Sequence, residues 1–485
     1  MAATERPRLT PPRKRFAGPS GAHSDNDNSS RETTVPPLFR RLARPLFIAS
    51  LAGAGLAIAP AAHAVPSFAR QTGQECVACH IGGFGPQLTP FGIRFKLGGY
   101  TDTDGKDGKV PLSAMAVGSY TRTSKDQDAP PADGYKVNNN ATLDEASIFL
   151  AGRLADKLGA FIQVTYDGVG KSTALDQVDI RFAQMTEVAG KDLVLGLSLN
   201  NNPGIQDPFN TLPVWRFPYV GSALGYGGVE SASLINGGVE QRVMGLSGYA
   251  FWDDHLYAEL GSYRSLSPAM QTKFGLGAAD DPGRLGGGTA YWRMAWFSDR
   301  KRDAWSAGLF GLNAALQPDR TPGTPSNRFN DVGVDAQYQF LGTREHVMTA
   351  QGSFVRERQT RNAFVASEAA ENLHGTLNEF RLNASYHWRQ TWGVTLGQFN
   401  TSGSADSLLY AANAGFRPNT AGQTLQVDWT PWGKEGSWGE PWANLRLGAQ
   451  FTRYSKYNGA AKNYDGAGRN ASDNNTLFLF AWTTF

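Results

Sequence analysis

Apolar and polar residues alternate along most of the chain beyond residue 109, in short segments separated by loops rich in Gly, Asn, Asp and Pro. The segments are about 9 to 13 residues long, and this alternation predicts β-strands with one apolar and one polar face. About sixteen such segments occur, at residues 114–123, 146–154, 160–167, 178–185, 193–200, 243–252, 255–265, 290–298, 305–316, 332–340, 347–358, 378–388, 392–400, 424–432, 444–455 and 476–485. No long helical periodicity interrupts them, so the pattern predicts an all-β structure.

The length and number of these segments indicate a membrane barrel. A tilted membrane strand needs about 9 to 11 residues, and bacterial outer-membrane barrels have an even number of strands. Aromatic residues near segment ends, such as Trp252, Trp296 and Trp482, suit girdles at the two membrane interfaces. A soluble sandwich or propeller is the alternative, and the lack of a repeat of about 40 residues argues against a propeller. We therefore predict an antiparallel outer-membrane β-barrel of about sixteen strands over residues 109–485.

Composition agrees with a barrel and disfavours other classes. The 485 residues include 56 glycines and 11% aromatic residues, and their mean hydropathy of −0.37 is too polar for a helical membrane protein. The formal net charge is only +3, so the charge balance gives no sign of nucleic acid as a partner. The same composition suits a barrel in which lipid-facing and lumen-facing residues alternate.

Residues 1–64 have the order of features expected of an N-terminal extension followed by a secretory signal peptide. Residues 1–39 are polar and contain little apolar material. A basic patch at residues 40–44 then precedes a short apolar run that ends in Ala-His-Ala. A transmembrane anchor is the alternative, but the run is short and small residues occupy the cleavage positions, so we expect cleavage after Ala64.

The two cysteines of the chain, Cys76 and Cys79, lie in the sequence CVACH, which ends with His80. An isolated cysteine pair in an exported chain is expected to form a disulfide. A structural zinc site needs about four ligands and a thioredoxin-like site needs a βαβ context, and the sequence indicates neither. Apart from a chance match, the remaining interpretation is covalent attachment of haem c, with thioethers at both cysteines and His80 as the proximal iron ligand. We predict one covalently attached haem c in a small domain at residues 65–108.

A domain of this size cannot enclose a haem without help, because about 45 residues barely build a core. The lumen of a barrel of about sixteen strands is wide enough to receive it as a plug. Residues 65–108 contain no methionine and no histidine besides His80, so a sixth iron ligand has to come from elsewhere, from an unusual side chain, or be absent. Met115 is a candidate distal ligand, on a strand face shared with Ser113, Ser119 and Thr121, although simple packing is the preferred interpretation, and His387 is a second candidate.

Two other stretches have plainer interpretations. Residues 102–109 resemble a calcium loop but lack the EF-hand spacing and its final Glu, so a solvated hinge is preferred. Residues 200–219 are long, Pro-rich and aromatic, which predicts an inward-folded constriction loop or an outer loop that meets substrate. Asp207 and Asn210 within this stretch are candidates for metal contact, although a structural loop is the preferred interpretation.

The chain resembles a known family at "PSFARQTGQECVACH", "LTPFGIRFKLGGYT", "DIRFAQM" and "GLSLNNNPGIQDPFNTLPVWRFPY". These stretches are similar to the fused cytochrome–porins of the bacterial outer membrane, best known as the iron oxidases of iron-oxidising bacteria. The resemblance spans the expected mature chain. It implies one haem c, attached at Cys76 and Cys79 and ligated by His80, and a barrel of about sixteen strands.

The function implied by this resemblance is electron transfer across the outer membrane. The chain is expected to be an oxidoreductase that takes an electron from extracellular Fe(II), with His80 as the catalytic residue, and passes it to a soluble periplasmic cytochrome or copper protein. The haem domain is expected in or facing the lumen and the periplasm. The family has no substrate motif to match, and some members occur in bacteria not known to oxidise iron. A conduit for another donor, and a porin whose haem domain is only a plug, therefore remain alternatives.

Overall fold

The computed structural model describes residues 65–106, 108–225 and 231–485. The expected N-terminal extension, the signal peptide and the cleavage after Ala64 lie outside the described residues. Within the described part of the chain, no helix is both long and apolar enough to cross a bilayer.

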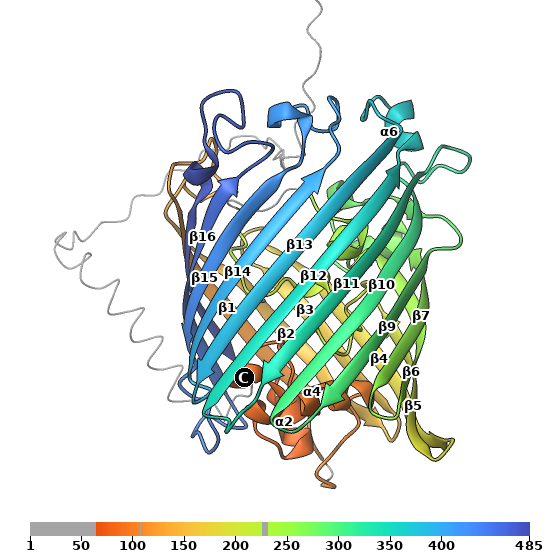
Figure 1. The fold of residues 1–485 in the computed structure, drawn as a ribbon, viewed down its shortest axis with the longest axis vertical. Helices are drawn as coiled ribbons and strands as arrows, with labels where there is room; N and C mark the ends of the chain where they lie inside the picture. Colours follow the sequence, from red (N-terminus) through yellow and green to blue (C-terminus); the bar gives the residue numbers. More distant parts are fainter. Residues whose placement is uncertain (1–64, 107, 226–230) are drawn as a thin grey trace, which may run out of the picture. The chain divides into compact units, whose positions relative to one another are not determined.

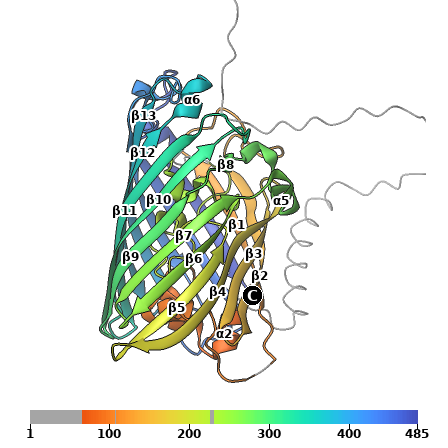
Figure 2. The ribbon, with the colours of Figure 1, turned by 90° about the vertical axis from the view of Figure 1, so that its right-hand side faces the viewer.

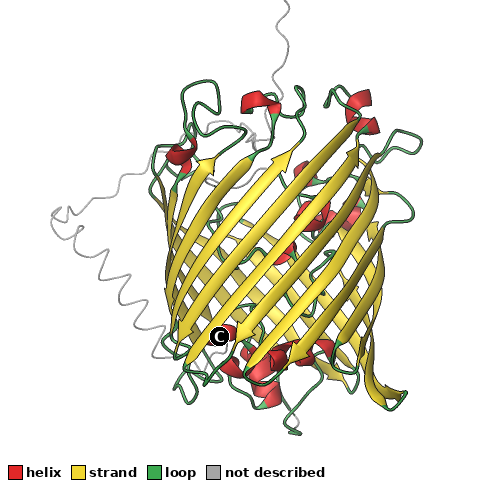
Figure 3. Cartoon of the chain, in the orientation of Figure 1, coloured by secondary structure: helices red, strands yellow, loops and turns green. Residues whose placement is uncertain are grey.

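One closed antiparallel sheet makes up most of the described chain (Figure 1, Figure 3). It contains sixteen long strands and a two-residue strand, β8 (Arg284–Leu285), which pairs with one end of β10. The long strands are β1 (Leu112–Thr123), β2 (Asn140–Ala155), β3 (Leu158–Asp167), β4 (Ser172–Val188), β5 (Lys191–Asn200), β6 (Val243–Trp252), β7 (Leu256–Ser265), β9 (Ala290–Asp299), β10 (Asp303–Gln317), β11 (Asn327–Phe340), β12 (His346–Thr360), β13 (His374–Trp388), β14 (Trp392–Gly403), β15 (Thr420–Trp429), β16 (Asn444–Lys456) and β17 (Thr476–Thr484). Each of the sixteen predicted segments coincides with one of them, so the predicted barrel is confirmed.

The first and last strands close the barrel. β1 pairs with β2 on one side and with β17 on the other, where Met115 lies opposite Thr484. Backbone hydrogen bonds join Ala114 and Phe485 in both directions, at 2.6 and 2.8 Å. Closure removes the free strand edges that an open sheet would present to other chains.

The wall has an apolar outer face and a polar inner face. In β11, Val332 and Val334 point outward and are nearly half exposed, whereas the alternating residues Asp331 and Asp335 point inward and are buried. Other strands repeat this arrangement with exposed leucine, isoleucine and methionine side chains on the outside. An apolar exterior around a polar lumen is the signature of a β-barrel that spans a membrane.

The two ends of the barrel differ in their connections. At one end the strands are joined mainly by tight turns, such as residues 156–157, 189–190 and 300–302, and we call this the short-turn end. The C-terminus lies at the same end, which is the lower end in Figure 1. Longer loops cover the opposite, long-loop end and carry α5 (Pro268–Lys273), η4 (Ala278–Asp280), α6 (Asn362–Ala366), η5 (Ala414–Phe416) and η6 (Ala471–Asn474). In outer-membrane barrels short turns face the periplasm.

The connection between β5 and β6 folds into the lumen in its described parts, residues 201–225 and 231–242, which are called the inward loop below. It carries the short helical turns η2 (Pro213–Trp215) and η3 (Leu234–Gly238), which are seen within the barrel in Figure 3. Three consecutive backbone N–H groups of the loop, at residues 233–235, donate to lumenal carboxylates: Ser233 to Glu379, Leu234 to Glu357 at 2.7 Å and Ile235 to Asp331 at 2.7 Å. For residues 200–219 the sequence allowed an inward-folded or an outer loop, and the burial of Asp207 against Arg293 of the wall favours the inward-folded one.

The chain before β1 forms a second element inside the barrel, which we call the plug segment, residues 65–106. It consists of α2 (Pro66–Thr72), α3 (Cys76–Cys79), η1 (Ile81–Gly83) and α4 (Pro90–Leu97). Its helices lie at the short-turn end (Figure 1, Figure 2). It joins the barrel in one compact unit, through contacts such as the 3.1 Å hydrogen bond from Arg181 on β4 to the carbonyl of Lys96.

One aromatic assignment is wrong. Trp252 and Trp296 lie on the outer face as predicted, but Trp482 points into the lumen and is buried. In β17 the residues alternate strictly, and Trp482 shares the inner face with Phe478 and Phe480. Its ring meets Phe84 of the plug segment edge-on, with centroids 4.9 Å apart. The position of Trp482 near a strand end indicated an interface residue, but the period of two decides which face it occupies.

Candidate functional site

The CVACH motif lies in the plug segment. A single turn of helix α3 carries Cys76 and Cys79, both as free thiols, and the His80 amide donates to the Cys76 carbonyl at 2.9 Å. The chain then returns, so that the Thr89 amide donates to the Cys79 carbonyl at 2.9 Å. A Cβ atom at Gly92 would overlap that same carbonyl oxygen, so only glycine lets α4 pack this closely on the motif.

His80 is neutral, and one of its two ring nitrogens makes no hydrogen bond within the described residues. Its Nδ1 atom is buried and has no hydrogen-bond partner among the described residues. Burial lowers the pKa of His80 to about 4, and a backbone hydrogen bond with Gly85 opposes this only in part. A neutral imidazole is the form that binds iron, and a buried ring nitrogen without a partner is unusual unless a ligand completes it.

The connection between β15 and β16, residues 430–443, covers the motif from the short-turn end and is called the cover loop below. The Glu440 carboxylate lies beside the Cys76 thiol, and neither of its oxygens has a hydrogen-bond partner among the described residues. The Gly436 amide donates to Glu75 at 3.0 Å. Sequence reasoning missed this loop, although its length among otherwise tight turns and its three tryptophans, Trp432, Trp438 and Trp442, were available as a signal.

Both thiols are protonated in this environment. Burial raises the pKa of Cys79 to about 12, with a further contribution from Asp102. Burial likewise raises the pKa of Cys76 well above its usual value, and the neighbouring Glu440 adds to the effect. Two reduced thiols one helical turn apart, followed by a histidine with an unpartnered nitrogen, fit the donor set that covalent haem c requires.

The two candidate distal ligands from the sequence both face the lumen near this motif. The sulfur of Met115 accepts a hydrogen bond from Trp482 Nε1 at 3.4 Å, and its side chain belongs to the apolar cluster that includes Phe84. His387, on β13, lies against the backbone of Gly82. Met115 as distal ligand stays a prediction.

The candidates for metal contact in the inward loop instead hold the plug and the barrel together. Arg293 on β9 lies 3.1 Å from Asp207 and 2.7 Å from Asp335 on β11. Asn210 accepts a hydrogen bond from Lys96 Nζ at 2.8 Å and donates to the Pro86 carbonyl at 2.7 Å. These contacts favour the structural interpretation of the loop.

Lys96 is the main link between the plug segment and the inward loop. Besides Asn210, its ammonium donates to the carbonyls of Ile205 at 2.9 Å and Asp207 at 2.7 Å, and it lies 4.5 Å from the centroid of the Trp215 ring. Burial lowers the pKa of Lys96 to about 7, and the nearby Arg181 guanidinium adds to this effect. Sequence reasoning did not find Lys96, because its partners lie more than a hundred residues away.

Carboxylates line the lumen beside the inward loop. Asp144 on β2 accepts from the Ala223 amide at 2.9 Å, and its other oxygen has no partner among the described residues. Asp176 on β4 accepts from Gln241 at 2.6 Å. No group of three or more His, Cys, Asp or Glu side chains in the described ranges is arranged to hold a free metal ion.

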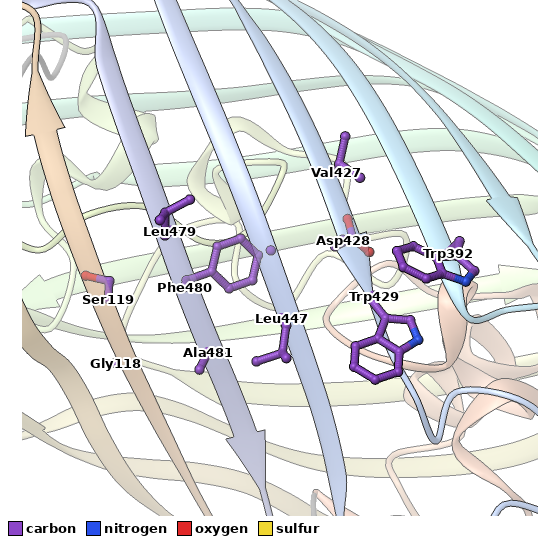
Figure 4. A pocket seen from close by; sticks show the side chains of 11 residues that line it. Gly118, Ser119, Trp392, Val427, Asp428, Trp429, Leu447, Leu479, Phe480 and Ala481 are labelled. Carbon is purple, nitrogen blue, oxygen red and sulfur yellow. The ribbon is translucent and has the colours of Figure 1, made fainter. Parts of the chain in front are cut away.

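The outer wall has a shallow depression over β14 to β17 (Figure 4). Trp392 and Trp429 lie directly opposite each other in the β14–β15 pair, with ring centroids 5.8 Å apart, and Leu447 and Leu479 also line the depression. Both tryptophans are exposed and lie where their strands meet the short-turn end. Their place suits an aromatic girdle at the membrane interface.

No protein-family model and no curated protein matches the chain. Among solved structures it is similar to OprB of Pseudomonas putida, with 14% identity, 77% of this chain and 93% of that chain covered, and a TM-score of 0.46. The outer membrane channel DcaP of Acinetobacter baumannii is 12% identical over 77% of this chain and 96% of that chain, with a TM-score of 0.41. The anion-selective porin from Comamonas acidovorans is 12% identical over 77% and 98%, with a TM-score of 0.38.

These TM-scores lie below 0.5, so the fold assignment rests on the strand pairing of this chain itself. The closed sheet, its apolar exterior and its polar lumen define a membrane-spanning β-barrel. More particularly, sixteen strands with tight turns at one end and long loops at the other make it a porin-like barrel of the outer-membrane type.

Proposed function

We propose that this chain is an outer-membrane cytochrome–porin that oxidises extracellular Fe(II) and passes the electron, through one covalently attached haem c, to a soluble periplasmic cytochrome or copper protein. One observation carries the proposal. The plug segment presents two free thiols and a buried histidine nitrogen that has no partner in the described part of the chain, at the short-turn end of a closed barrel. Fe(II) as donor is supported by the resemblance to the cytochrome–porin family.

Cys76 and Cys79 would hold the haem through thioethers, and His80 would bind its iron. The bound group would supply one-electron chemistry at iron, which no side chain of this plug provides by itself. The protein residues position the motif: Lys96 ties it to the inward loop, and Asn444 on β16 donates to the Gly83 carbonyl at 2.9 Å. Rigid placement keeps the motif at a constant distance from both mouths of the barrel.

The charge of the lumen supports a cationic donor. Asp144 and Asp176 lie beside the inward loop, on the long-loop side that faces outward in barrels of this type. Carboxylates in a confined lumen raise the local concentration of cations by electrostatic attraction. The acceptor would dock at the short-turn end, where Trp438 of the cover loop is 77% exposed.

A diffusion porin whose N-terminal segment only plugs the lumen is the second candidate, because a closed barrel with a polar lumen is all that this function needs. The contacts of Lys96 and Asn210 join the plug segment to the inward loop and would serve a plug equally well, so covalent haem is what separates the two candidates. A conduit for a donor other than Fe(II) uses the same residues, so only a reaction with the donor separates it from iron oxidation.

The test starts with the full chain purified from a host that attaches haem c. We expect the haem to stay with the polypeptide on a denaturing gel and to be lost in a Cys76→Ser/Cys79→Ser variant. Stopped-flow absorbance after mixing the oxidised protein with Fe(II) should then show rapid reduction of the haem bands. A chain without covalent haem would refute the cytochrome and leave the porin. Reduction by dithionite but not by Fe(II) would refute iron oxidation and leave a conduit for another donor.

A further inference from the structure

His387 of β13 reaches the plug segment two residues beyond His80. A Cβ atom at Gly82 would lie 2.7 Å from Cδ2 and 2.9 Å from Nε2 of the His387 ring. Gly82 has a φ of +71°, and with no side chain it leaves room for the edge of the imidazole that carries Nε2. A histidine of the barrel wall therefore touches the plug backbone just beyond the predicted proximal ligand.

This contact is held by hydrogen bonds on both sides. The Gly82 amide donates to Gln390 at 2.7 Å, and Gln390 belongs to the turn that follows β13. The next residue of the plug segment, Gly83, is bound through its carbonyl by Asn444 at 2.9 Å. Because Gln390 is only three residues from His387, one hairpin fixes both the glycine and the histidine that packs on it.

The His387 ring has no evident structural role. Its side chain is 5% exposed, and its Nδ1 atom is buried with no hydrogen-bond partner among the described residues. The charged groups that face it are Asp428 on β15 and Arg446 on β16, which form an ion pair with each other at 2.8 Å. No hydrogen bond at Nδ1 therefore fixes the orientation of this ring within the described structure.

We propose that His387 is the second protein ligand of the iron of a haem bound at Cys76 and Cys79. The inference rests on the function proposed above and adds to it the missing ligand. The lone pair of Nε2 would form the coordinate bond, and the ring proton would remain on Nδ1. One iron would then join an imidazole of the plug segment to an imidazole of the wall.

The alternative ligand, Met115, is already engaged. Its sulfur accepts the Trp482 N–H and its side chain packs in an apolar cluster, which gives it a structural role that His387 lacks. The two ligands have different electronic consequences, because a thioether raises the reduction potential of haem relative to a second imidazole. With His387 bound, iron coordination is complete only while the plug segment sits in the barrel.

The experiment uses the haem-loaded full chain and its oxidised spectrum. Electron paramagnetic resonance and optical absorption of the wild-type protein should show low-spin iron with two nitrogen ligands. His387→Gly should convert it to high-spin iron, and added imidazole should restore the low-spin signal. Met115→Leu should leave the signal unchanged. His346→Gln is a matched control, because His346 also lies at the short-turn end but is exposed and bonds Tyr386 at 2.7 Å.

The migration of an unheated sample on a gel shows whether the His387→Gly barrel is folded. If it is folded and the low-spin signal survives, the inference is overturned. Loss of the signal in Met115→Leu would overturn it in favour of the thioether. Both results would leave the proposed function intact, because covalent haem and its reduction by Fe(II) are measured separately. A wild-type chain without covalent haem would instead refute the proposed function, and this inference with it.

Discussion

The wall of the barrel and the chain enclosed by it are stabilised in opposite ways. The wall has ladder hydrogen bonds between neighbouring strands and an apolar outer face, and its stability is spread over many equivalent contacts. The enclosed plug segment and inward loop consist of short helices and irregular backbone, and a few charged side chains hold them. Arg293, Asp207 and Asp335 are all fully buried, and so is the Arg181–Asp179 pair.

This difference determines how sensitive each region is to single substitutions. A wall strand needs only the right alternation, so many single substitutions leave its pattern intact. The enclosed chain depends on particular partners, and removing one leaves a buried charge without compensation. We therefore expect single substitutions to have larger effects inside the barrel than on its outer face.

The largest effect is expected for Arg293→Met. It leaves the carboxylates of Asp207 and Asp335 buried and unpaired, and breaking such a pair costs about 3 to 5 kcal/mol. Denaturant unfolding of the detergent-solubilised protein, followed by tryptophan fluorescence, measures the loss. The matched control is Arg300→Met at an exposed turn, which should change the free energy of unfolding little. Equal effects of the two variants would contradict the role given to the buried charges.

The next effect tests the outer face. Leu396 on β14 is 60% exposed on the outside of the wall, so Leu396→Arg places a charge in the lipid and should cost about 2 to 4 kcal/mol near the bilayer centre. Unfolding from lipid bilayers measures the change. Leu396→Met is the control, and it should be nearly neutral because it keeps an apolar side chain in the lipid. A neutral Leu396→Arg would show that this face does not meet lipid.

A smaller effect is expected for Lys96→Met. It leaves the carbonyls of Ile205 and Asp207 and the side chain of Asn210 without their donor, at a cost of about 1 to 3 kcal/mol. The plug segment and inward loop should separate more often, which raises the ion conductance of single barrels in a planar bilayer. Lys106→Met, at an exposed position of the hinge, is the control. Unchanged conductance in Lys96→Met would show that this link does not keep the lumen closed.

The smallest effect concerns Glu440 before haem attachment. Burial, together with the charge of Glu75, raises the pKa of Glu440 from 4.5 to about 7. The folded state therefore favours the protonated carboxyl, and this stabilisation is fully present below pH 4.5 and lost as the pH rises through about 7. The thermal midpoint of the haem-free protein should fall across this window, and Glu440→Gln should flatten that slope. An equal slope in both proteins would exclude Glu440 as its source.

The strands could be predicted from the sequence because their information is local. The period of two marked all sixteen segments, and the one wrong face, that of Trp482, was assigned from its position near a strand end. Residues 200–219 were also recognised as a long loop from their proline and aromatic content, but the sequence did not decide between an inward and an outer course.

The candidate site could be predicted only in part. Cys76, Cys79 and His80 are adjacent in sequence, so their chemistry was visible in the motif itself. The contacts of Glu440 with Cys76 and of Asn444 with Gly83 join residues about 360 positions apart in the sequence. These residues come together only when the barrel closes. The carboxylates of Asp207 and Glu357 likewise gave no sequence sign that they hold the inward loop.

The junction of the first and last strands implies an order of assembly. The plug segment leads directly into β1, and Ser67 of α2 binds Ser113 at its start, while the backbone of Ala114 is bonded to Phe485. The seam is therefore made from the two ends of the chain, and the thiols lie behind the cover loop once it forms. For the haem attachment proposed above, this arrangement implies that the two thiols, which are only partly exposed in the closed barrel, are modified before the seam forms.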